Sequence, residues 1–330
     1  MFTSNRASGF GRTAVGVVAL ACAACASDAS RVPLQRAAGT VPTTVATVPP
    51  TTVPPTTAVP LPPAQAVVSP KGFALPVEGS DPAGYVVQTP CGNRAVLPSG
   101  TPLSGATVVL DPGHGGGETG AIGPNGLGEA VVNLAVAQQA RATLAAAGVN
   151  VVMTRSTDVR VVLATRSQLV DKLHPQAFVS IHHNSTPDGP RAGPGTETFY
   201  QDRSQASKRL AGLVYEEAVR ALSTYQVDWV GNVDAGAKYR VNDRGGDYYH
   251  MLRETAGVPS ALAELAFISD PPEAALLARP DVQDVEGQAV ARGILRFLRT
   301  RDAGSGYVNP VPRNTPATGG GAEGCVDPPL

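Results

Sequence analysis

The distribution of apolar residues divides the middle of the chain into short β-branched runs and longer amphipathic stretches. The runs have the length of buried strands and lie at residues 106–110, 149–155, 177–182, 195–200 and 260–265. The amphipathic stretches repeat apolar residues every three or four positions and predict helices at residues 129–148, 205–222 and 282–298. Since strands and helices alternate, we predict one α/β domain over residues 104–301, with a largely parallel central sheet flanked by helices.

Residues 1–26 have the composition of a signal peptide. Two arginines and no acid precede an apolar stretch, which ends in the small residues 24–26 (ACA) that are typical of a cleavage site. The stretch is short for a membrane span. We therefore expect export to the periplasm or cell wall and no membrane span in the mature chain, while a lipid anchor at Cys22 or Cys25 stays open.

The segments that flank the predicted domain differ from it in composition. Residues 27–71 are rich in Pro and Thr, which removes backbone donors and apolar side chains, so we expect a disordered linker. Residues 72–103 are expected to pack on the domain as an N-terminal extension, and residues 302–330 to form a largely unstructured C-terminal tail. Export favours a disulfide between Cys91 and Cys325, the two cysteines that follow the signal peptide, and two free thiols are the alternative.

The charge balance limits the kinds of partner. The chain has 26 Lys and Arg residues against 27 Asp and Glu residues, for a net charge of −1, and it has no long basic run. Affinity for nucleic acid depends on clustered Lys and Arg. We therefore expect no nucleic-acid partner.

Three residues at the ends of predicted elements form a candidate metal site. His114 follows a strand in a Gly-rich loop, His182 ends the strand at residues 177–182, and Glu129 opens a predicted helix. Alone, His114 could be a loop residue, and Glu129 could complement the helix dipole. Together, two His and one Glu form the ligand set that holds a hydrolytic Zn²⁺ with one open position.

An acid within an apolar strand is the fourth candidate. Glu264 lies in the apolar run LAELAF. Burying an unpaired carboxylate in such a strand costs on the order of several kcal/mol. A general base beside a metal site would account for it. The alternative is an ion pair with Arg155 or Arg166.

Five segments, in this order, resemble the motifs of zinc-dependent N-acetylmuramoyl-L-alanine amidases, which are bacterial peptidoglycan hydrolases. They are LDPGHGG, GLGEAVVNLA, FVSIHHN, GTETFY and LAELAFISD. The resemblance implies that His114, Glu129 and His182 bind zinc and that Glu264 is catalytic. It also implies a mixed central sheet surrounded by helices.

The implied reaction is hydrolysis of the amide bond between N-acetylmuramic acid and L-alanine, by a monomer that binds peptidoglycan or a muropeptide. A zinc peptidase acting on stem peptides and a noncatalytic wall-binding protein are the alternatives. His183 is expected at the rim of the site, and His174 on the surface. His250 is also expected on the surface, unless it lines the substrate groove, and residues 228–249 could gate that groove.

Overall fold

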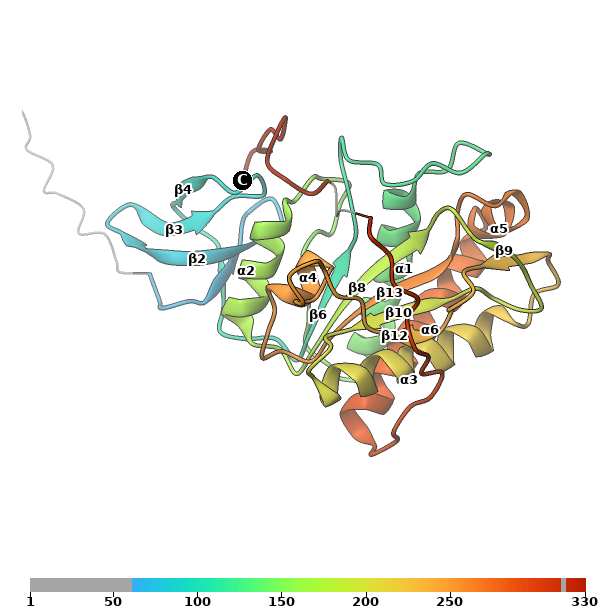
Figure 1. Ribbon diagram of the computed structural model, residues 1–330. Helices are drawn as coiled ribbons and strands as arrows, with labels where there is room; N and C mark the ends of the chain where they lie inside the picture. The colour runs from blue at the N-terminus through green and yellow to red at the C-terminus, as the bar shows by residue number, and fades with distance from the viewer. Residues whose placement is uncertain (1–60, 316–318) are drawn as a thin grey trace, which may run out of the picture. The chain divides into compact units, whose positions relative to one another are not determined.

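The computed structural model describes residues 61–315 and 319–330 (Figure 1). The expected signal peptide and most of the expected linker lie outside these residues. Of the helices within them, none is both long enough and apolar enough to cross a membrane.

A six-stranded sheet with the order β12-β10-β13-β8-β6-β7 forms the centre of the fold. Its strands are β6 (Val108–Pro112), β7 (Val151–Met153), β8 (Ala177–Asn184), β10 (Glu197–Tyr200), β12 (Ala237–Lys238) and β13 (Ser260–Phe267). The pair of β10 and β13 is antiparallel, and the other neighbours in this sheet are parallel. The predicted mixed, largely parallel sheet is therefore confirmed.

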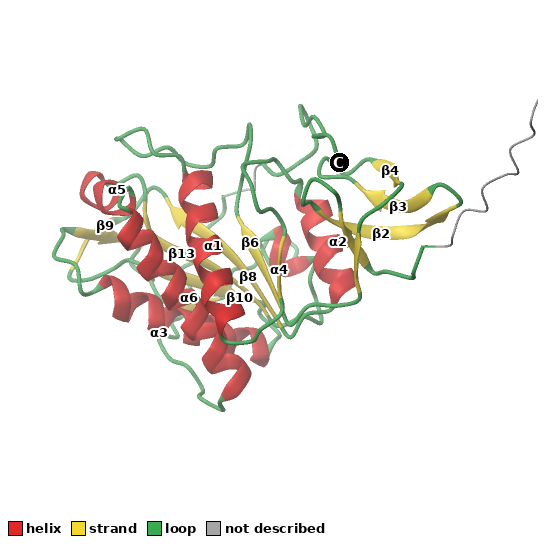
Figure 2. Cartoon of the chain, turned by 180° about the vertical axis from the view of Figure 1, so that it is seen from behind, coloured by secondary structure: helices red, strands yellow, loops and turns green. Residues whose placement is uncertain are grey.

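Helices cover both faces of this sheet. The long helices α1 (Glu129–Ala146), α3 (Gln205–Leu222) and α6 (Pro280–Arg299) pack together over one face, as Figure 2 shows. The other face carries α2 (Leu163–Leu173) and α4 (His250–Arg253), and α5 (Pro271–Leu277) follows β13. The three long helices agree with the sequence prediction, whereas the apolar pattern did not predict α2, α4 and α5.

Side-chain alternation along β8 decides which residues face which layer. Val179 and Ile181 belong to the core that the long helices share, whereas Phe178 packs with α2. Successive side chains of a strand point to opposite faces. His182 therefore lies on the α2 side of the sheet, and His183 points toward the long helices.

A second sheet precedes the central one and corrects the expected linker boundary. Its five antiparallel strands, in the order β4-β3-β2-β1-β5, are β1 (Ala66–Val68), β2 (Ala74–Asp81), β3 (Gly84–Gln88), β4 (Arg94–Leu97) and β5 (Thr101–Leu103). Strand β1 lies inside the segment expected to be linker, and its Ala66 and Val67 are fully buried. The run AVV has no proline and supplies apolar side chains, so it pairs where the Pro/Thr pattern ends.

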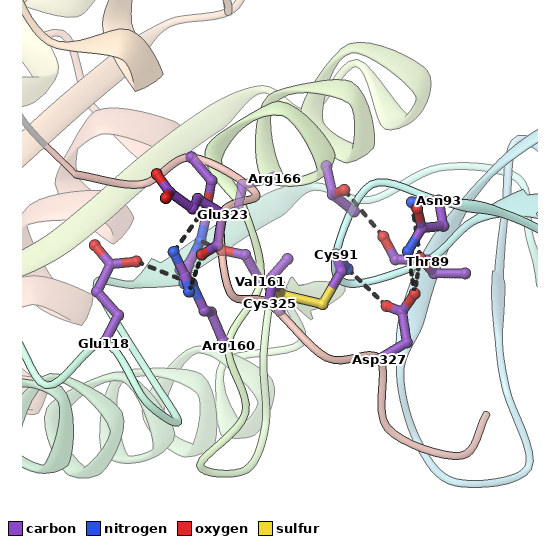
Figure 3. The surroundings of a disulfide bond; sticks show 12 residues. Thr89, Cys91, Asn93, Glu118, Arg160, Val161, Arg166, Glu323, Cys325 and Asp327 are labelled. Carbon is purple, nitrogen blue, oxygen red and sulfur yellow. Dashed lines mark hydrogen bonds and ion pairs between the residues drawn. A yellow bond between two sulfur atoms is a disulfide. The ribbon is translucent and has the colours of Figure 1, made fainter.

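The C-terminal segment is held along the domain, in contrast to the expected unstructured tail. Cys91 and Cys325 form the predicted disulfide, with their Cα atoms 5.6 Å apart (Figure 3). Arg160 donates hydrogen bonds of 2.9 Å to two backbone carbonyls of the segment, and the Asp327 carboxylate accepts one of 2.7 Å from the Cys91 amide. The C-terminal segment, which has few apolar side chains, is thus held to the domain by the disulfide and by hydrogen bonds.

A further two-stranded sheet pairs β9 (Gly189–Arg191) with β11 (Trp229–Gly231).

Candidate active site

The loop after β6 brings His114 next to His182. His114 has a φ of 59°, a left-handed conformation that is rare for residues other than glycine. The neighbouring Gly113 leaves room for the imidazole of His182, which a Cβ at this position would overlap. The loop conformation therefore serves the close approach of the two rings, whose centroids are 5.0 Å apart.

Hydrogen bonds among buried polar residues hold this loop in place. The Asp111 carboxylate accepts hydrogen bonds from Arg166 (2.7 Å), Thr154 (2.6 Å) and Ser180 (2.7 Å). Burial alone would raise the pKa of Asp111, but the Arg166 charge and these hydrogen bonds outweigh it and lower the pKa. Arg166 and Arg155 also donate to backbone carbonyls of the loop and the preceding strand end. Both guanidinium groups are thus committed to the scaffold of the site.

The Glu129 carboxylate lies between the two histidines. Its Oε1 is 2.9 Å from His182 Nδ1, and its Oε2 is 3.2 Å from His114 Nε2. Burial alone would raise the pKa of Glu129, but the interactions with both histidines outweigh it and hold the pKa well below its usual range. Burial alone would lower the pKa of His114, but Glu118 and Glu129 outweigh it and raise the pKa to about 9. The Glu129 carboxylate is therefore ionised and interacts with both imidazole rings.

This ligand set fits a metal ion. One ligand atom from each of His114, Glu129 and His182 lies within 4.8 Å of the others. Two imidazoles and a carboxylate from separate segments make a three-residue set that leaves further positions of a metal ion open. The three residues predicted from the sequence are therefore brought together by the fold.

Glu264 lies beside this set, on the same face of the sheet. In register it is opposite His182 on β8 and opposite Glu197 on β10. Its Oε2 is shielded from solvent, and the described residues offer it no hydrogen-bond partner. Burial, together with the charges of Glu129 and Glu197, raises the pKa of Glu264 well above its usual range. The expected alternative, an ion pair with Arg155 or Arg166, is not what the structure shows.

His183 corrects the expectation of a rim residue. It is 1% exposed, and its Nδ1 donates to Asn133 Oδ1 (2.8 Å) while its Nε2 is 3.3 Å from Glu286 Oε2. The Asn133 amide in turn donates to Glu129 Oε1 (3.2 Å). His183 is thus part of a buried network behind Glu129. The alternation of β8 carries the signal that was overlooked, because adjacent residues of a strand cannot face the same side.

A cavity of about 670 Å³ opens over the two histidines. Residues of the segment 228–249 line one part of it, and the C-terminal segment lines another through residues 310, 311, 313, 315, 319 and 320. His250 also lines this cavity, and His174 is exposed as expected. Five Lys and Arg side chains line this cavity, together with the carboxylates of Asp111, Glu118 and Asp234.

The sequence of this chain is similar to those of known proteins. A family model described as N-acetylmuramoyl-L-alanine amidase matches residues 108–296. The chain is 32% identical over 220 residues to the germination-specific N-acetylmuramoyl-L-alanine amidase of Bacillus subtilis, and the match covers 62% of this chain and 85% of that protein. It is 34% identical over 207 residues to the uncharacterized protein YqiI of the same species, with 62% and 88% covered.

A solved structure shows the same similarity in three dimensions. The N-acetylmuramoyl-L-alanine amidase from Clostridium difficile 630 superposes with a TM-score of 0.51 at 27% identity. The superposition covers 61% of this chain and 100% of the other. The family match runs from the start of β6 into α6 and so includes the segments that carry His114, Glu129 and His182.

Proposed function

Because the chain belongs to the N-acetylmuramoyl-L-alanine amidase family, we propose that it hydrolyses the amide bond between N-acetylmuramic acid and L-alanine in peptidoglycan. The observation that carries this proposal is the convergence of His114, Glu129 and His182 beside the unpartnered carboxylate of Glu264. Cell-wall remodelling, division or turnover would use this reaction. In this proposal the catalytic domain spans residues 104–301.

The metal that we propose is zinc, held by His114, Glu129 and His182. When bound, zinc supplies Lewis acidity that polarises a carbonyl and makes a water molecule more acidic. The protein fixes the ligands beforehand, because Glu129 is hydrogen-bonded by Asn133 and by the backbone amide of Ala121 (2.9 Å). Little reorganisation is then needed when the ion binds.

Glu264 is the proton acceptor in this proposal. It takes a proton from the attacking water while the water oxygen bonds to the lactyl carbonyl carbon. When the carbon–nitrogen bond breaks, the same carboxyl group returns the proton to the nitrogen of L-alanine. Its lack of a hydrogen-bond partner and its raised pKa suit a group that must accept a proton. The products are a glycan with a free lactyl carboxylate and a peptide with a free amino terminus.

Digestion of purified peptidoglycan, followed by mass spectrometry of the products, tests the proposal. We expect peptides that begin with a free L-alanine and glycans that keep an intact lactyl group. A zinc peptidase would instead leave L-alanine attached to the glycan, and a wall-binding protein would release nothing. Either of these product patterns would overturn the amidase assignment.

Metal content tests the ligand assignment separately from the reaction. We expect about one zinc per chain and loss of hydrolysis on chelation, with recovery when zinc is added. His114→Ala and His182→Ala should each lose most of the bound metal, because a three-residue site loses a ligand. Full zinc content in either variant would show that the ligands lie elsewhere.

The cellular setting belongs to the same proposal. A signal peptide at residues 1–26 would export the chain to the periplasm or cell wall, where its substrate lies, and residues after 26 would space the domain from the membrane. The disulfide between Cys91 and Cys325 fits an oxidising compartment. We propose that the exported protein acts as a monomer, which sedimentation of the mature chain would test.

A further inference from the structure

The basic side chains at the cavity over the two histidines differ in whether they are paired. Five basic side chains line the cavity, and four of them form ion pairs with carboxylates. Arg166 pairs with Asp111, and Arg253 pairs with Glu254. Lys238 pairs with Glu197 and Asp234, and Arg313 pairs with Asp188 and Asp234. Arg240 is the exception among the described residues, since none of their carboxylates lies within salt-bridge distance of it. A cation that lines a cavity without a counter-ion is available to an anionic ligand.

The surroundings of Arg240 hold its guanidinium group in place without neutralising it. The group lies over the ring of Tyr248, 3.6 Å from the ring centroid. Its Nη2 donates to Thr315 Oγ1 (3.3 Å), while its Nε is shielded from solvent and has no acceptor within residues 61–315 and 319–330. Stacking on an aromatic ring fixes the plane of the fork and keeps its charge. Arg240 is therefore held in place at the cavity wall and keeps its positive charge unpaired within the described part of the chain.

Arg240 lies where the catalytic cavity continues into a second cavity of about 640 Å³. Both cavities share Arg240, Tyr248 and Thr315 in their linings. A peptidoglycan substrate extends away from the scissile amide as a glycan on one side and as a stem peptide on the other. The second cavity offers space for one of these two arms.

Tyr249 connects this region with the catalytic carboxylate. Its ring packs on Phe199, 4.7 Å away between centroids, in the wall of the same cavity. Burial and the Glu264 charge raise the pKa of Tyr249, and Arg240 acts in the opposite direction. Tyr249 therefore lies close enough to Glu264 and to Arg240 for the charges of both groups to act on it.

We propose that Arg240 binds a carboxylate of the stem peptide and thereby makes the enzyme selective for peptides with free acids. The inference rests on the proposed function, because stem peptides are where this substrate carries carboxylates close to the scissile bond. A guanidinium fork matches a carboxylate in a bidentate, charge-assisted pair. The segment 228–249, whose gating role the sequence leaves open, then contributes a specificity residue.

Two substrates that differ only in charge test this role. The probes are N-acetylmuramoyl-L-alanyl-D-glutamyl-L-lysine with its carboxyl groups free and the same compound with these groups converted to primary amides. For Arg240→Gln we expect kcat/KM to fall roughly 10- to 100-fold on the acid, mainly through KM, and to change less than about threefold on the amide. Arg240→Lys keeps the charge but loses the fork, so it should lose less on the acid.

Arg244→Gln is the matched control. Arg244 is an exposed residue of the same segment that lines neither cavity, and its replacement removes the same single charge. We expect its kinetics to equal those of the wild type on both substrates. An equal loss for Arg240→Gln on acid and amide would overturn the carboxylate assignment, as would no loss on either. Wild-type protein that cleaves neither probe nor peptidoglycan would contradict the proposed function itself.

Discussion

Replacing Glu264 by glutamine separates a catalytic carboxylate from a structural one. The glutamine side chain keeps the shape of glutamate but cannot accept the proton. Since no residue in the described chain donates a hydrogen bond to Glu264 Oε2, the change breaks no hydrogen bond there. It also removes a group whose charge is opposed by those of Glu129 and Glu197. We therefore expect the free energy of unfolding to fall by less than about 1 kcal/mol, the net value of one typical hydrogen bond.

The rate should behave differently from the stability. Loss of general acid–base catalysis lowers turnover by roughly 10²- to 10⁴-fold. At about 1.4 kcal/mol for each factor of ten, this corresponds to about 3 to 5 kcal/mol of lost transition-state stabilisation. The measurements are zinc content, thermal unfolding and release of L-alanyl peptides from peptidoglycan, all on one purified preparation of Glu264→Gln.

Glu197→Gln is an informative control because Glu197 is the neighbour of Glu264 in register. Glu197 is 2% exposed and forms a buried ion pair with Lys238. Removing one partner of such a pair costs about 3 to 5 kcal/mol when the remaining charge is left unpaired, and because Asp234 still pairs with Lys238 we expect a loss toward the lower end of this range. A stable, zinc-loaded Glu264→Gln variant with undiminished cleavage would end the catalytic assignment. Destabilisation equal to that of Glu197→Gln would show that Glu264 has a structural role instead.

Three further predictions concern the supporting structure. His183→Ala leaves buried polar partners unsatisfied and should cost about 1 to 3 kcal/mol for each of them in thermal unfolding; an unchanged melting temperature would contradict the network behind Glu129. Asp111→Asn uncouples Arg166 and should cost about 3 to 5 kcal/mol. The pKa of Asp111 is lower in the folded state, so its ionised carboxylate stabilises the fold fully at pH values above the ordinary aspartate range. This stabilisation is lost as the pH falls through the lowered pKa. In acid titrations the wild type should therefore lose more unfolding free energy than Asp111→Asn. Cys91→Ser with Cys325→Ser should lower stability by about 2 to 4 kcal/mol, and equal denaturant midpoints for oxidised and reduced wild type would refute this.

The residues of the candidate site could be predicted from the sequence because they lie next to the ends of predicted strands and helices. His182 closes a β-branched run, and Glu129 opens an amphipathic stretch. An acid in the apolar run around residue 264 has few explanations, since burying a charge is costly. The period of each run also predicted the central sheet and its long helices, because hydrophobic periodicity is a local property.

Only the tertiary structure decided how these residues combine with the rest of the chain. The role of Arg166 as the partner of Asp111 rather than Glu264 depends on a helix that the sequence pattern did not reveal. The C-terminal segment, with almost no apolar periodicity, lines the cavity because a disulfide and polar contacts hold it there. The pairing state of Arg240 likewise depends on which acids other segments bring near it. Contacts between residues far apart in the chain leave no local pattern, so composition and spacing could not predict them.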